Sequence, residues 1–171
     1  MATAATQELN EIVVLRNQNR MIHAVVRMNT DGLSHTDSLI RPQPAGNSMN
    51  WIVGHLLCVY NNVLQGAFGQ APLMPNQSLK CYDRGTATVS ESDAQDFSAL
   101  LAAWDEATNR FDAGLSTLTP DRLDEKAPFS PSNNPEETVR SVMGVVMFHQ
   151  AYHAGQTAIL RRIAGKPGAL K

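Results

Sequence analysis

Apolar residues recur at helical spacing in four long stretches of the chain, separated by segments rich in glycine and proline. The stretches cover about 7–33, 48–68, 94–118 and 134–164, and the spacing predicts an amphipathic α-helix in each. The third is the most regular. Its apolar stripe is Phe97, Leu100 and Leu101, Trp104, Thr108, Phe111, Leu115 and Leu118.

Residues at the ends of these stretches match the known preferences of helix termini. Asn47 or Ser48 is suited to cap the second helix, and Asn134-Pro135-Glu136-Glu137 resembles a helix start with an asparagine cap, a first-turn proline and favourable carboxylates. Gly165-Lys166-Pro167 is a matching stop signal for the fourth helix. Thr119-Pro120-Asp121 predicts a further short helical turn.

Two connections are long. The segment 70–90 holds two prolines, Gly85 and few apolar residues, and 126–134 is predicted as loop. A structureless connection of this length in a compact domain is more often functional than idle. No region alternates in the period of a β-strand, so we expect one all-α domain over residues 1–171, a four-helix bundle whose handedness the pattern leaves open.

Composition narrows the class of protein. The 171 residues are 43% apolar and 18% charged, with a formal net charge of −2, as expected for a soluble globular protein. The charges are scattered, and the basic footprint of a nucleic-acid-binding protein is absent from the sequence. No stretch of 18 apolar residues predicts a membrane span.

The expected compartment is the cytoplasm. The start, Met1-Ala2-Thr3-Ala4-Ala5, has neither the basic residues nor the apolar run of a signal peptide. Two cysteines, Cys58 and Cys81, do not suggest a disulfide framework, which favours a reducing environment.

Three histidines carry the most specific chemistry in the sequence. His149 and His153 are four residues apart, which places both imidazoles on one helical face about 6 Å apart. Both fall in the predicted buried stripe of the fourth helix, and His55 falls in that of the second. We therefore expect the three to bind one divalent metal ion. Three imidazoles would leave a coordination position open, as in catalytic sites.

Other interpretations remain open. Histidines four apart occur by chance, and all three can be hydrogen-bonded core residues with no metal. Gln150 stands where the protease signature H-E-x-x-H has a glutamate, and an amide cannot act as a general base, so a zincin-type protease is disfavoured.

Several neighbouring residues are weaker candidates. Cys58 can be a further ligand but is better explained as a small core residue, and Tyr152 and Gln156 can hydrogen-bond near the metal. Arg84, in a loop long enough to roof the site, either binds a substrate carboxylate or is an ordinary surface arginine. His23 and His35 are predicted at the surface.

Two segments resemble the DinB-like superfamily of metal-dependent enzymes. One runs from Arg41 to Leu56 and includes Asn50-Trp51-Ile52-Val53-Gly54-His55, and the other is Phe148-His149-Gln150-Ala151-Tyr152-His153-Ala154-Gly155-Gln156 with the following Leu160-Arg161-Arg162. The resemblance spans nearly the whole chain. It implies a four-helix bundle in up-down-down-up order, a three-histidine site for zinc or nickel, and frequent homodimers. Gln150 departs from the family pattern, because many relatives carry a glutamate there.

The resemblance also suggests an activity. Characterised relatives include transferases and isomerases that use a low-molecular-weight thiol such as bacillithiol or mycothiol. The favoured hypothesis is a metal-dependent transferase, or a related hydrolase or isomerase, that acts on a small molecule through the open position of the metal. The alternative is a non-catalytic protein whose metal stabilises the bundle or serves a binding role in stress response.

Overall fold

Four long helices form the body of the protein in the computed structural model, which describes residues 3–86 and 89–169. They are α1 (Thr3–Thr30), α3 (Met49–Gly66), α5 (Phe97–Leu115) and α7 (Val139–Ile163). Shorter elements lie between them: α2 (His35–Leu39), α4 (Asn76–Leu79), the 3-10 helix η1 (Lys80–Tyr82) and α6 (Pro120–Asp124). No strand is found in the described residues, so the predicted all-α class is confirmed.

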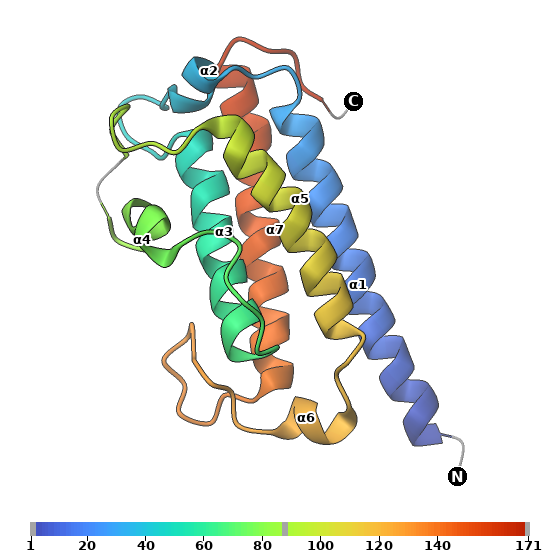
Figure 1. Ribbon diagram of the computed structural model, residues 1–171. Coiled ribbons are helices and arrows are strands. Elements are labelled where there is room, and N and C mark those ends of the chain that lie inside the picture. Colours follow the sequence, from blue (N-terminus) through green and yellow to red (C-terminus); the bar gives the residue numbers. More distant parts are fainter. Residues whose placement is uncertain (1–2, 87–88, 170–171) are drawn as a thin grey trace.

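The long helices pack in a ring. Each contacts two neighbours, in the pairs α1 with α7, α7 with α3, α3 with α5, and α5 with α1. Figure 1 shows α1 and α7 running in one direction, and α3 and α5 in the other. The order along the chain is therefore up, down, down, up, and the long connections allow it.

One contiguous apolar core lies between the four helices. It includes Val26 of α1, Leu56 of α3, Trp104 of α5 and Val146 of α7, all at most 1% exposed. Burial of such side chains contributes about 1.5–3 kcal/mol each to folding. Among the described residues, we find no helix with both the length and the apolar character needed to cross a membrane.

The predicted ends of the second helix and of the last helix agree with the structure. The Ser48 hydroxyl accepts a hydrogen bond from the Trp51 amide (3.3 Å) and caps α3. Gly165 follows α7 with a φ of 77°, a conformation that glycine adopts without the strain of a Cβ. The N-terminal residues Met1 and Ala2 lie outside the described part.

The last helix begins later than the sequence suggested. Asn134 instead starts a turn, closed by a hydrogen bond from the Glu137 amide to its carbonyl (3.2 Å), and α7 begins at Val139 with Thr138 as N-cap. Antiparallel pairing of Thr138 with Lys126 keeps the backbone extended just before the helix. The predicted Asn134 cap is therefore wrong, because tertiary pairing outweighs the local signal.

The buried stripe of α7 also differs from the predicted one by one residue at its centre. Gln150 and Ala154 are 0% and 3% exposed, whereas His149 and His153 are only half-buried. Consecutive helical residues point about 100° apart, so burying Gln150 turns the two histidines toward the edge of the core. They line a cavity there rather than fill the bundle.

Candidate metal centre

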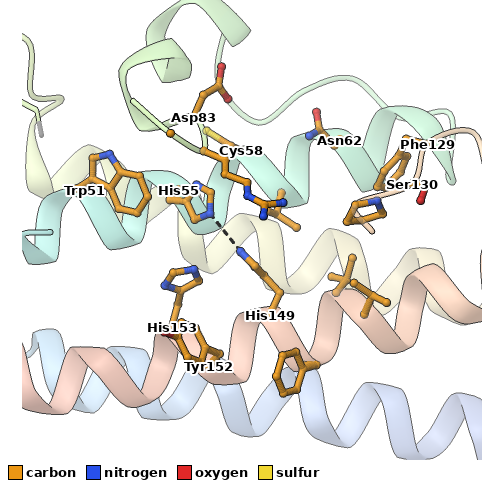
Figure 2. A pocket seen from close by; sticks show the side chains of 17 residues that line it. Trp51, His55, Cys58, Asn62, Asp83, Phe129, Ser130, His149, Tyr152 and His153 are labelled. Atoms are coloured by element: carbon orange, nitrogen blue, oxygen red, sulfur yellow. Dashed lines mark hydrogen bonds between the residues drawn. The ribbon is translucent and has the colours of Figure 1, made fainter. Parts of the chain in front are cut away.

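The three predicted histidines meet between α3 and α7, although 94 residues separate His55 from His149 (Figure 2). The Nε2 atoms of these two rings are 3.1 Å apart. The ring centres of His55 and His153 are 5.1 Å apart, and those of His149 and His153 are 4.5 Å apart. Each residue offers one nitrogen, and the three nitrogens lie within 4.8 Å of one another.

His55 is held on two sides. Its Nδ1 lies 2.8 Å from the backbone carbonyl of Tyr82, which can only accept a hydrogen bond. Nδ1 must therefore carry the proton, and the lone pair lies on Nε2, which faces His149. The indole of Trp51, one turn earlier on α3, stacks on the imidazole with ring centres 4.6 Å apart. These contacts fix the orientation and the tautomer of His55.

Gln156 orients the last histidine in a similar way. Its Oε1 accepts a hydrogen bond from Nδ1 of His153 (2.8 Å), which leaves Nε2 of that ring free as a ligand. His149 differs, because its Nδ1 is buried without a hydrogen-bond partner in the described part of the chain.

All three imidazoles favour the neutral form. Burial lowers the pKa of His55 and of His153 below the ordinary value of a histidine. The pKa of His149 falls to about 4, first because of burial and then because of the charges that His153 and His55 would carry. Neutral imidazole is the form that binds metal ions, so near pH 7 no proton has to leave first.

The spacing fits a single ion. Two imidazoles bound to one metal at about 2.0–2.1 Å, with a bond angle between tetrahedral and octahedral values, have nitrogens about 2.8–3.4 Å apart. The 3.1 Å between the Nε2 atoms of His55 and His149 falls in that range. The group could therefore hold a divalent metal, with imidazole ligands that suit zinc, nickel, copper or iron.

The histidines lie at one end of a cavity of about 690 Å³ (Figure 2). Its wall combines α3, α7 and two loop segments, 83–85 and 129–131. Its lining also includes apolar side chains, among them Val59, Val145, Val146 and the exposed Phe148. The volume suits a small organic molecule, and the apolar wall would keep much of the bulk water from it.

Cys58 and Tyr152, two of the weaker candidates, differ in how far they are buried. Cys58 lines the cavity but is 8% exposed, and its thiol donates to the Leu79 carbonyl (3.4 Å). Burial raises its pKa to about 12, so it is a protonated core thiol, as the sequence favoured. Tyr152, by contrast, is 59% exposed and lies at the cavity rim beside His153.

The histidines outside the cluster form local contacts. His23 is half-buried and pairs with Asp105 at 2.7 Å, and His35 accepts a hydrogen bond from the Phe97 amide (3.2 Å). Both were predicted as surface residues, and neither lies among the residues of the cavity.

Sequence reasoning missed the role of Tyr82. The residue is fully buried, and its hydroxyl donates to Asn50 Oδ1 (2.8 Å) and accepts from the Gln95 amide (2.7 Å). These bonds fix the loop whose carbonyl orients His55. The position of Trp51, four residues before His55 and so on the same helical face, was the available signal for the stacked indole.

Gly54→Ala is expected to loosen this loop and to lower the free energy of unfolding by about 1–3 kcal/mol, a typical cost of overpacking. A Cβ at Gly54 would lie 2.5 Å from the Tyr82 ring, so the ring and its loop must shift. Chemical denaturation measures the loss. Gly144→Ala is the matched control, because a Cβ there meets nothing within 4 Å, and we expect it to stabilise α7 by up to about 1 kcal/mol. Equal stability of the two variants would contradict the prediction.

Comparison with known proteins gives a family and a fold. The model of a family described as mycothiol-S-transferase matches residues 17–165, which include the whole histidine cluster. Among solved structures, the chain is similar to one titled "Crystal structure of the conserved protein of locus from Enterococcus faecalis". The TM-score is 0.70 at 13% identity, with 90% of this chain and 96% of that chain covered, so this likeness shows the fold alone. No curated protein matches.

Proposed function

The chain belongs to the mycothiol-S-transferase family of the DinB-like superfamily, and from that premise we propose that it joins a low-molecular-weight thiol, through its sulfur, to an electrophilic small molecule. The thiol gives up its proton, and the electrophile either loses a leaving group or, in an addition, takes up that proton. We further propose that His55, His149 and His153 hold one divalent metal, zinc or nickel. The observation that supports this best is the convergence of three neutral imidazoles at the end of an apolar cavity.

The arrangement of ligands suits catalysis better than a structural role. No carboxylate or thiol joins the three histidines in the described part of the chain, and structural zinc sites are usually closed by four protein ligands. A divalent metal with an open position lowers the pKa of a thiol and so makes the nucleophilic thiolate available near neutral pH.

The protein's own residues would contribute position and environment. The Tyr82 carbonyl and Gln156 keep two of the rings in the tautomer that presents Nε2 to the site. The stacked Trp51 covers one face of His55. The valines and Phe148 along the cavity would hold an apolar electrophile close to the sulfur. Holding both reactants in place makes a bimolecular reaction effectively unimolecular and so raises its rate.

Turnover of a thiol with an electrophile tests the proposal. Untagged protein would be loaded with one equivalent of Zn²⁺ or Ni²⁺ and mixed with mycothiol, bacillithiol or cysteine and an electrophile such as monobromobimane. We expect a rate above the uncatalysed reaction that requires the metal and differs between thiols. Full metal loading with no such rate for any thiol would overturn the transferase, and cleavage of an ester or amide would indicate a hydrolase instead.

We also propose that two copies associate through the outer face of α7 and its neighbour α1. Phe148, Tyr152 and Ile159 on α7 are 59–73% exposed, and Met21 on α1 is 63% exposed. Apolar area of this kind on a helix pair is typical of a protein–protein interface. Small residues between the large ones, Ala151 and Gly155, are exposed too and would allow close helix packing.

Ile159→Glu is expected to shift the protein from dimer to monomer, because it buries a charge in the proposed interface. Sedimentation equilibrium measures the mass. Ile40→Glu is the control, since Ile40 is also exposed (40%) but follows α2, which packs against α3 and α5. A wild-type protein that sediments as a monomer at high concentration would contradict the homodimer.

A further inference from the structure

Arg84 stands at the edge of the cavity, on the loop that also orients His55. We propose that its guanidinium binds a carboxylate of the substrate, so that the enzyme selects small molecules that have an apolar body and one anionic group. This inference rests on the proposed function for the identity of the cavity as the substrate site. It adds the class of substrate, which neither the histidines nor the family determines.

The backbone that carries Arg84 is firmly held. Below it, Tyr82 is fully buried against Gly54 of α3. Beyond it, the Thr86 hydroxyl donates to the Asp83 carbonyl (2.7 Å) and accepts from the indole nitrogen of Trp51 (3.3 Å). Arg84 therefore projects from a short segment fixed on both sides. A backbone that is already fixed loses less conformational entropy when a ligand binds to the side chain that it carries.

The side chain itself has no partner in the described part of the chain. Arg84 is exposed, and the ion pairs found among the described residues all involve other side chains. Its neighbour Asp83 does not neutralise it: Figure 2 shows the Asp83 carboxylate pointing away from the histidine cluster. A guanidinium with five free donors is suited to bind a carboxylate through two parallel hydrogen bonds.

Arg84 lines the same cavity as His55, His149 and His153. An anion held by Arg84 would therefore share that cavity with the histidine cluster. The group that reacts with the sulfur and the group that is recognised would then belong to one small molecule.

The rest of the cavity explains why the body of the ligand should be apolar. Besides the histidines, Arg84 and Asp83 are the charged side chains among the described residues that line it, and Asn62 and Ser130 lie at the end away from the cluster. Valines and Phe148 also line the cavity. A guanidinium beside apolar side chains discriminates between ligands by charge, because only an anion can form the charge-assisted pair of hydrogen bonds with it.

Two probes of equal shape test this selectivity: 3-phenylpropionate, which carries a carboxylate, and 3-phenylpropionamide, which does not. Isothermal titration calorimetry with the metal-loaded protein is expected to show that the carboxylate binds about tenfold more tightly or better, the usual effect of a charge-assisted pair. Arg84→Gln should reduce the preference to less than about threefold while leaving amide affinity within twofold. Arg84→Lys should restore part of it, because the charge returns without the planar pair of donors.

Arg20→Gln is the matched control, since Arg20 is an exposed arginine of α1 that pairs with Asp112 and does not line the cavity. A carboxylate preference that survives in Arg84→Gln would overturn the proposal, because the metal and not Arg84 would then be the group that binds the anion. Equal binding of the two probes by the wild-type protein would overturn it as well.

A second pair of probes distinguishes which reactant carries the carboxylate. If N-acetylcysteine binds more tightly than its amide and this difference depends on Arg84, the anion belongs to the thiol. If only the phenylpropionate pair shows an Arg84-dependent difference, the anion belongs to the electrophile. Both readings support the anion site. Because these measurements record binding, they can succeed even if no thiol is turned over, so failure of the transferase and failure of the anion site are distinguishable.

Discussion

His153→Ala is expected to remove the bound metal and to lower the rate of metal-dependent thiol transfer by at least about a hundredfold. The imidazole is one of the three proposed ligands at the end of the cavity, and two remaining rings would bind the ion too weakly to retain it during purification. The truncation also frees the Gln156 oxygen, which has no other role in the site. Elemental analysis of untagged protein, together with the thiol-transfer rate, measures both effects.

The matched control is His23→Ala, which removes an imidazole that is also half-buried and also hydrogen-bonded, but to Asp105 between α1 and α5. It should keep one metal per chain and most of the rate. His153→Ala protein that still purifies with stoichiometric metal would exclude His153 as a ligand. Wild-type protein without stoichiometric metal would favour the alternative that the three histidines are ordinary core residues.

The positions of the long helices could be predicted because each stripe is dense in large apolar residues. In α5, Trp104, Phe111 and Leu115 are all fully buried, at the helical spacing that the sequence showed. Such a stripe excludes other registers, since rotating the helix would expose several large side chains at once. The shared face of His149 and His153 could also be predicted, because residues four apart on one helix lie on the same side of it whatever the rest of the chain does.

Features that depend on partners from distant segments could not be predicted. Asn19 interrupts the apolar stripe of α1, yet it is fully buried: its amide donates to the Thr108 carbonyl (3.1 Å) and its oxygen accepts from the Tyr60 hydroxyl (2.6 Å). Each partner belongs to a different helix, so the sequence around Asn19 contains no sign of them. Tyr82 is similar, because its support of His55 depends on how the loop folds back over α3.

Gln156 is the residue through which the proposed binding of a metal by His153 can be changed without replacing a proposed ligand. Gln156→Leu is expected to weaken metal affinity by about 10–100-fold, the usual cost of losing the acceptor that orients a histidine ligand. The Nδ1 proton of His153 would lose its 2.8 Å partner, so the ring could rotate and also present the wrong nitrogen. Competition with a chromogenic chelator measures the affinity of each variant.

Gln156→Glu tests whether the hydrogen bond to His153, and not only the volume of the side chain, is what metal affinity requires. A carboxylate accepts the same proton and makes the imidazole a stronger donor to the metal, so affinity should equal or exceed that of the wild type, whereas leucine of similar size should lose it. The half-buried position can accept a charge that is partnered by the Nδ1 proton. Thermal unfolding of the metal-free variants should be alike, because neither change alters the apolar core. Equal metal affinity in the leucine and glutamate variants would show that the hydrogen bond to His153 does not position a ligand.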